Sequence, residues 1–254
     1  MIKVIKVGGG IIEQDDNLNT FLNSFSKIKG PKVLVHGGGR LATKVAEDIG
    51  YKTTMVEGRR VTDKKMLEIV TMVYGGLANK RIVAILQSKG TNAMGLSGAD
   101  GSLITAHKRP VEKIDYGWVG DIDGVNTNLL IKLIHSNIVP VIAPLSHDGN
   151  GNILNTNADT IASEISKALA KKEETHLILG FELDGVLKDF NDKSSVIEKI
   201  NPQSFEELKS EGIISEGMIP KLSNAFNAID AGVTSVRICN ALKIGDNAGT
   251  LISK

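Results

Sequence analysis

Val4-Ile5-Lys6-Val7-Gly8-Gly9-Gly10 is the stretch that decides the fold: a short apolar strand that carries one lysine and runs directly into three glycines. Backbone N–H groups of glycines can face an anion directly, and a following helix adds the positive end of its dipole. The Walker pattern differs, because its lysine follows the glycines. The stretch therefore predicts either a phosphate-binding loop at which Lys6 is aimed, or an edge strand on which Lys6 is only a solvated charge.

A second unit of the same kind follows within the first fifty residues. Apolar residues at helical spacing from 18 to 28 lead to a buried-strand pattern at 32–35, which runs into His36-Gly37-Gly38-Gly39 and a further helix to Ile49. Asp15 or Asp16 is the expected N-cap of the first of these helices. Alternating strands and helices favour a mostly parallel sheet covered by helices, that is, an α/β fold.

Composition excludes several classes of protein. The chain has 254 residues, with Lys+Arg 30 against Asp+Glu 29, so nothing indicates a nucleic-acid or acidic-membrane partner. The single Cys239 lies in an apolar run, which favours a buried thiol in a reducing cytoplasm. No signal peptide is recognised at Met1, and no apolar run is expected to reach the length of a membrane span.

The middle of the chain contains an arginine segment and a region without clear period. Gly58-Arg59-Arg60-Val61-Thr62-Asp63 precedes a helical pattern over 66–73, with Thr62 as the expected N-cap, and a second helical stretch covers 79–88. The two arginines are either solvated or part of a site. Residues 110–126 are expected to form a hairpin or loop excursion around Trp118.

Two helix starts carry charged residues that have both a structural and a functional explanation. In Asn155-Thr156-Asn157-Ala158-Asp159, Asn157 is a good N-cap and Asp159 suits the helix dipole, which explains both without any site. In Pro220-Lys221 the lysine opposes the dipole at a helix start. A residue placed against local preference suggests a functional role, although a solvated lysine remains the alternative.

Taken in order, these segments resemble the amino acid kinase family over essentially the full chain, in its branch that phosphorylates N-acylated glutamate. The matching segments are Lys6-Val7-Gly8-Gly9, His36-Gly37-Gly38-Gly39, Gly58-Arg59-Arg60-Val61-Thr62, Gly95-Leu96-Ser97-Gly98-Ala99-Asp100-Gly101, Asn155-Thr156-Asn157-Ala158-Asp159, Gly217-Met218-Ile219-Pro220-Lys221 and Gly249-Thr250-Leu251-Ile252. The Arg-Val-Thr and Asn-x-Asn-Ala-Asp segments are the most specific to that branch.

The resemblance implies a three-layer αβα sandwich with a mostly parallel central sheet of about eight strands. It implies one domain with two lobes: residues 1–172 would bind the acylglutamate and dimerise, and residues 173–254 would bind ATP. The implied reaction transfers the γ-phosphoryl group to the side-chain carboxylate of the acylglutamate. That carboxylate is already ionised at neutral pH, so no general base is needed.

Catalytic and binding roles are also implied by the resemblance. Lys6 and Lys221 would hold the phosphoryl oxygens, and Asp159 would orient both ammonium groups. Substrate contacts would come from Gly38, Gly39, Arg60, Asn155 and Asn157, where Arg60 offers a planar fork to the α-carboxylate. Nucleotide contacts would come from Gly8, Gly9, Glu182, Gly185 and Gly217. Glu182 departs from the family pattern, which has an aspartate there, and Glu216 replaces a glycine.

The resemblance further implies ATP as co-substrate with Mg²⁺ held mainly by phosphates and water, because no carboxylate cage is visible. Because Met1 lies almost on the first strand, the N-terminal extension of hexameric, arginine-inhibited relatives is missing. We therefore expect a simple homodimer without strong arginine feedback. The acyl group is left open between acetyl and succinyl. Alternatives are a carbamate or UMP kinase of the same family, or a non-catalytic ligand sensor; a dehydrogenase is disfavoured without a strict Gly-x-Gly-x-x-Gly.

Overall fold

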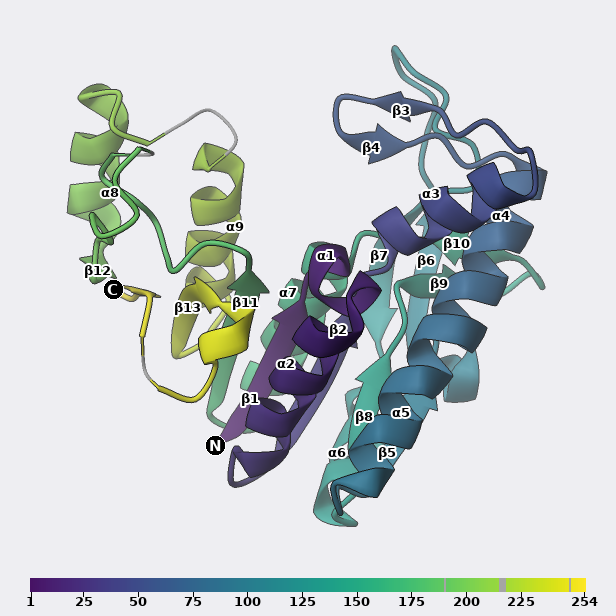
Figure 1. The fold of residues 1–254 in the computed structure, drawn as a ribbon, viewed down its shortest axis with the longest axis horizontal. Coiled ribbons are helices and arrows are strands. Elements are labelled where there is room, and N and C mark those ends of the chain that lie inside the picture. Colours follow the sequence, from purple (N-terminus) through teal and green to yellow (C-terminus); the bar gives the residue numbers. More distant parts are fainter. Residues whose placement is uncertain (190, 215–217, 247) are drawn as a thin grey trace.

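The computed structural model describes residues 1–189, 191–214, 218–246 and 248–254. Its centre is an eight-stranded sheet in the order β12-β14-β13-β11-β1-β2-β8-β5 (Figure 1). These strands are β1 (Ile2–Val7), β2 (Lys32–His36), β5 (Ala93–Leu96), β8 (Val139–Ile142), β11 (Thr175–Phe181), β12 (Lys199–Ile200), β13 (Ser235–Asn240) and β14 (Thr250–Ile252). Neighbouring strands are parallel except β13 and β14. The predicted mostly parallel sheet of about eight strands is therefore confirmed.

The opening strand β1 lies in the middle of this sheet. It pairs in parallel with β2 on one side and with β11 on the other, over Ile2↔Thr175 to Val7↔Gly180. Its side chains alternate between two cores, with Val4 on one face and Ile5 and Val7 on the other. A strand that is buried on both faces has apolar residues at successive positions. This explains why β1 consists mainly of valine and isoleucine.

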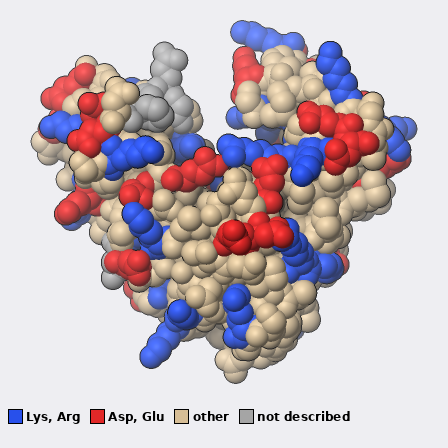
Figure 2. Space-filling view, in the orientation of Figure 1, with Lys and Arg blue, Asp and Glu red and all other residues tan. Residues whose placement is uncertain are grey.

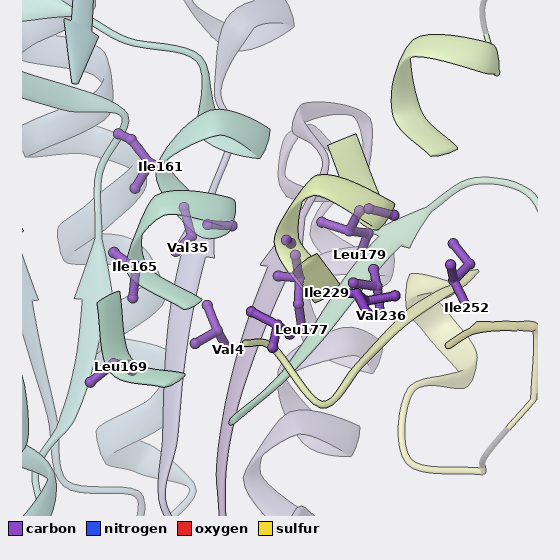
Figure 3. Packing of buried hydrophobic residues seen from close by; sticks show 14 of the residues in the cluster. Val4, Val35, Ile161, Ile165, Leu169, Leu177, Leu179, Ile229, Val236 and Ile252 are labelled. Atoms are coloured by element: carbon purple, nitrogen blue, oxygen red, sulfur yellow. The ribbon is translucent and has the colours of Figure 1, made fainter. Parts of the chain in front are cut away.

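Helices cover both faces and complete the three layers. The helices are α1 (Gly9–Glu13), α2 (Asp15–Lys27), α3 (Gly39–Asp48), α4 (Lys64–Val70), α5 (Asn79–Ser88), α6 (Thr127–His135), α7 (Ala158–Ala170), α8 (Pro202–Ser210) and α9 (Ile219–Asp230). On one face α2 and α5 contribute Phe21, Phe25 and Ile82 to the core. On the other, α7 packs Ile161 and Ile165 beside Val4 and Leu177 (Figure 3).

Helix starts differ in two places from the sequence-based expectation. The N-cap of α2 is Gln14, and Asp15 and Asp16 lie in the first turn, where carboxylates also favour the dipole. The N-cap of α4 is Asp63 rather than Thr62, since the Asp63 carboxylate accepts from the backbone N–H of Met66 at 2.8 Å. Thr62 is instead buried, and its hydroxyl accepts from the amide of Asn155.

The stretch 64–88 forms one continuous helix rather than two. A π-helical segment, η1 (Thr71–Ala78), joins α4 to α5. Gly75 and Gly76 lie inside it and do not break the helix. This helix has 25 residues, and an 18-residue window of it has a mean hydropathy of 1.4, so it is long and apolar enough to cross a membrane, contrary to expectation. However, 44% of that window is buried inside the fold. The core helix of a globular protein can have the same length and composition.

A second sheet lies beside the carboxyl ends of β2 and β8. Its order is β10-β9-β6-β7, formed by β6 (Ile104–Lys108), β7 (Gly120–Val125), β9 (Leu145–His147) and β10 (Ile153–Asn155). The hairpin or loop excursion expected at 110–126 is not a hairpin of its own: residues 120–125 form the strand β7, which pairs antiparallel with β6, with a register shift between Thr105 and Ala106. A smaller hairpin, β3 (Met55–Val56) with β4 (Arg59–Arg60), stands above α3 (Figure 1).

Candidate active site

A cavity of about 440 Å³ opens between the β3–β4 hairpin and the start of α9. Figure 2 shows the corresponding hollow between two raised parts of the molecule. The charged side chains that line it are mainly cationic: Lys6, Arg59, Arg60, Arg109, Lys167 and Lys221, against Asp159 and Glu164. A concave surface with this excess of positive charge attracts and holds anions.

Lys6 enters this cavity from the carboxyl half of β1. Its side chain is 8% exposed, and Nζ lies 2.9 Å from Oδ1 of Asp159 in the first turn of α7. Because β1 is central, the edge-strand interpretation of Lys6 is wrong. The Asn157 side chain accepts from the N–H groups of Asp159 and Thr160, at 2.8 and 3.1 Å, which confirms it as the cap of α7. A buried ammonium is thereby paired with a carboxylate that a capped helix holds in place.

Lys221 reaches the same point from the other half of the chain. It lies in the first turn of α9, after Pro220, as its sequence predicts. The ammonium groups of Lys6 and Lys221 both lie over the ring of Phe181, at 4.7 and 4.3 Å from its centroid. Two ammonium groups are thus gathered around one aromatic ring at the end of β11, and the Asp159 carboxylate is bound to one of them.

The two triglycine loops touch each other through their backbones. A Cβ on Gly37 would lie 2.9 Å from the backbone N of Gly9, and one on Gly9 would lie 3.3 Å from the N of Gly38. A Cβ on Gly38 would lie 2.7 Å from the ring of Tyr74. Side chains at these positions would therefore force the loops apart. Gly9, Gly38 and Gly39 line the cavity.

His36 stands behind the second glycine loop and is fully buried. Its Nδ1 lies 2.7 Å from the carbonyl oxygen of Gly37, and its Nε2 lies 3.1 Å from the amide nitrogen of Asn79. Nδ1 therefore donates to Gly37, and Nε2 accepts from Asn79, which assigns the neutral tautomer. Burial lowers the pKa of His36 to about 4, in spite of the opposing bond to Gly37.

Arg60 is buried at the junction of β4 with the second glycine loop. Its Nη2 donates to the Gly39 carbonyl and to the Thr43 hydroxyl, each at 2.8 Å. The guanidinium therefore holds the loop and lines the cavity at the same time. Asn155, at the end of β10, donates to Thr62 at 2.9 Å and lines the same cavity.

A second cavity of about 430 Å³ adjoins the first. The residues that line both are Gly9, Gly39, Phe181 and Lys221, and the second also contains Gly8, Gly10 and Glu182. Gly185 does not line either cavity; it packs where a Cβ would lie 2.8 Å from the Thr250 hydroxyl. Gly217, and the variant residue Glu216 before it, lie outside the described residues.

The sequence did not single out several residues that shape the site. Phe181 and Tyr74 are aromatic rings that contact the two lysines and Gly38, and Arg109 forms a bidentate pair with Asp121 that lowers the pKa of that carboxyl. Phe181 lies at the carboxyl end of β11, after Gly180, and an aromatic residue in that position is not unusual enough to be singled out from the sequence. Among the described residues, no group of three or more His, Cys, Asp or Glu side chains could hold a metal ion.

The sequence and the fold of this chain are similar to those of known proteins. The model of the amino acid kinase family matches residues 1–240. The acetylglutamate kinase of Bacteroides thetaiotaomicron is 56% identical over 253 residues, covering 100% of this chain and 98% of that protein. The acetylglutamate kinase of Phocaeicola vulgatus is 55% identical with the same coverage. The crystal structure of smu.665 from Streptococcus mutans superposes with a TM-score of 0.79 at 30% identity, over 99% of this chain and 98% of that one.

Proposed function

The chain belongs to the amino acid kinase family, and from this premise we propose that it transfers the γ-phosphoryl group of ATP to the side-chain carboxylate of N-acetyl-L-glutamate, as the acetylglutamate kinases it resembles are named for doing. The product is an N-acylglutamyl 5-phosphate, an intermediate of arginine biosynthesis. A second acyl group, succinyl, remains within the proposal, and turnover of the two compounds distinguishes them.

The observation that carries this proposal is the convergence of Lys6 and Lys221 on Phe181, at the point where the two cavities meet. Phosphoryl transfer needs little covalent work from a protein; it needs positioned reactants and positive charge around the moving group. Two ammonium groups that approach from different halves of the chain supply that charge. Asp159 holds Lys6 in place at 2.9 Å.

We propose that the acylglutamate occupies the first cavity. Gly38 and Gly39 offer backbone N–H groups, the Arg60 guanidinium suits the α-carboxylate, and Asn155 suits the acylamino group. Arg60 keeps its Nη2 contacts to Gly39 and Thr43, so substrate binding and loop position are coupled through one side chain. A carboxylate nucleophile is ionised at neutral pH, and the reaction therefore proceeds without a general base.

We propose that the nucleotide phosphates occupy the second cavity, against Gly8 and Gly9, where Glu182 also lies. Mg²⁺ would accompany ATP and neutralise phosphate charge. The described part of the chain offers no carboxylate cage, which suits an ion held by phosphate oxygens and water.

Two lobes follow from this assignment. We propose that residues 1–172 bind the acylglutamate and form the dimer contact, and that residues 173–254 bind ATP. Lys171-Lys172-Glu173-Glu174 separates α7 from β11, and the sheet passes from one lobe to the other between β1 and β11. A cytoplasmic location fits a biosynthetic enzyme that uses ATP.

The deciding test is acyl-phosphate formation trapped with hydroxylamine. The purified protein is given Mg-ATP and, separately, glutamate, N-acetylglutamate, N-succinylglutamate, carbamate and UMP, the last with ADP release as readout. We expect turnover with an N-acylglutamate, and the ratio of kcat/KM for the acetyl and succinyl compounds identifies the acyl group. Turnover only with carbamate or UMP assigns a different kinase, and ATP binding without turnover on any acceptor assigns a sensor.

A further inference from the structure

The second cavity contains an ion pair between the two halves of the chain that the proposed reaction does not use. Arg40, the second residue of α3, and Glu182, which follows β11, are joined by Nη1 and Oε1 at 3.0 Å. Both line the cavity that also contains Gly8, Gly10 and Lys221. The pair therefore lies where we place the nucleotide phosphates, and a role for it in nucleotide binding rests on that proposed function.

Gly10 lies directly beneath this pair. A Cβ added to Gly10 would collide with Oε1 of Glu182 and would lie 2.7 Å from Nη1 of Arg40. The carboxylate thus rests against the backbone of the first triglycine loop, where a phosphate oxygen would approach. A phosphate and a carboxylate cannot both occupy this position, because like charges at contact distance repel.

The ion pair between Arg40 and Glu182 is weak enough to break when another anion binds. The side chains of Arg40 and Glu182 are 64% and 58% exposed, and such surface ion pairs contribute only about 0–1 kcal/mol. A guanidinium binds phosphate in the same forked geometry as carboxylate, and a polyphosphate carries more charge. Exchange of one anion for another on Arg40 is therefore favourable.

We propose that Arg40 is a phosphate-binding residue of the nucleotide site, and that Glu182 occupies its guanidinium when no polyphosphate is bound. Binding of ATP moves Arg40 from Glu182 to the phosphates, and Glu182 leaves the loop. Glu182 then competes with the nucleotide instead of binding it.

Four proteins test this: the unaltered chain, Arg40→Gln, Glu182→Gln and the double variant. Dissociation constants are measured for ATP, ADP, AMP and adenosine by calorimetry, and KM for ATP and for N-acetylglutamate by the hydroxylamine assay. Arg40→Gln should raise the dissociation constants of ATP and ADP by about tenfold, as expected for a lost charged hydrogen bond. It should leave the dissociation constant of adenosine unchanged. Glu182→Gln should lower the dissociation constant of ATP by about threefold, which is within the range of the energy of an exposed ion pair. The double variant should bind ATP as Arg40→Gln does.

Arg81→Gln is the matched control, because Arg81 also forms an ion pair between two elements, with Asp15, on the surface formed by α2 and α5. It should leave all four dissociation constants unchanged. If Arg40→Gln weakened the binding of ATP and of adenosine equally, Arg40 would only connect the two halves of the chain structurally. That result would overturn the proposal. Weaker ATP binding in Glu182→Gln would also overturn it, since Glu182 would then contact the nucleotide directly.

The outcomes separate this inference from the proposed function. If the unaltered chain phosphorylates an N-acylglutamate and Arg40→Gln keeps its affinity for ATP, the function stands and the inference fails. If no acceptor is phosphorylated but the phosphate-dependent loss in Arg40→Gln is present, the inference stands and the function fails.

Discussion

Lys221 stands in the first turn of α9, where its charge opposes the helix dipole, and beside Lys6 around Phe181. Positive charge placed in this way stabilises negative charge that develops on a transferring group more than it stabilises a bound substrate. Lys221→Ala should therefore lower kcat by about 10²–10³-fold and change KM for N-acetylglutamate little. Steady-state kinetics checks this. A raised KM with kcat retained would assign Lys221 to ground-state binding.

Arg60 has two partners in the second glycine loop, so its removal has two effects. Arg60→Ala should raise KM for N-acetylglutamate and should also lower the free energy of unfolding by about 1–3 kcal/mol, because the Gly39 carbonyl and the Thr43 hydroxyl lose a charged donor. Kinetics and urea denaturation measure the two separately. An unchanged KM would remove Arg60 from the substrate site.

His36 makes the stability of this loop dependent on pH. Its pKa is lowered from 6.5 to about 4 in the folded protein, so the unfolded chain takes up the proton first as the pH falls. The contribution of neutral His36 to the free energy of unfolding is therefore fully present above pH 6.5. It is lost as the pH falls from 6.5 to 4, by about 3 kcal/mol. Urea denaturation at pH 7 and pH 4.5 measures the loss.

His36→Asn provides the comparison for that measurement. The variant is less stable at pH 7 but should lose about 2–3 kcal/mol less than the unaltered chain between the two pH values. An equal loss in His36→Asn would mean that other groups cause the pH dependence.

The residues of the candidate site were partly predictable from the sequence. Lys221 stands out because a lysine in the first turn of a helix opposes the helix dipole, and Lys6 because it directly precedes a glycine loop. Asp159 suits its helix start, and only the family resemblance assigned it a role. Phe181 and Arg40 carry no such signal, since an aromatic residue at a strand end and an arginine in a helix are ordinary. Their importance comes from contacts with residues distant in the sequence, Phe181 with Lys6 and Lys221 and Arg40 with Glu182, which no local pattern encodes.

At the scale of one element, Lys32 ties the end of α2 to the sheet. Its buried ammonium donates to the carbonyls of Phe25, Ser26 and Ile28, at 2.9, 3.2 and 2.5 Å, and so caps a helix C-terminus. Lys32→Met should lower the free energy of unfolding by about 2 kcal/mol. Lys29→Met, at an exposed lysine of the same connection, should change it by less than about 0.5 kcal/mol. If urea denaturation showed the same loss of stability for both variants, Lys32 would not stabilise the end of α2 as a cap.

The elements themselves were predicted where a single period extends over several residues, as in β1, β2, α2 and α7. The sequence predicted two helical stretches where the structure has one long helix at 64–88, and Gly75 and Gly76, both poor helix formers, lie between the two. A π-helical segment accommodates both glycines there, and tertiary packing of Val73 and Tyr74 in the core overrides their propensity. The strand β7 was missed because it contains two glycines and two aspartates, which are depleted in strands.

At the scale of the whole molecule, the homodimer remains a prediction, and the long helix suggests where the contact lies. Met72 and Leu77 are 58% and 52% exposed, and they stand five residues apart, about one turn of a π-helix. Exposed apolar residues on one face of a helix suit a subunit contact.

Leu77→Asp should therefore convert the dimer to a monomer at micromolar concentration, because a buried unpaired carboxylate is costly. Sedimentation velocity measures the change. Ile49→Asp, at a residue 56% exposed at the C-terminal end of α3, should leave the dimer intact. A dimer that persists in Leu77→Asp would place the contact elsewhere.

The position of β1 between β2 and β11 has a consequence for synthesis on the ribosome. The first strand to emerge pairs on one side with Lys32–His36 early, but its other edge waits for Thr175–Phe181. Until more than two thirds of the chain has been made, an apolar strand edge stays open to other nascent chains. Such long sequence separation slows folding and favours aggregation of incomplete chains. A stalled chain that ends before residue 175 would therefore depend on chaperones.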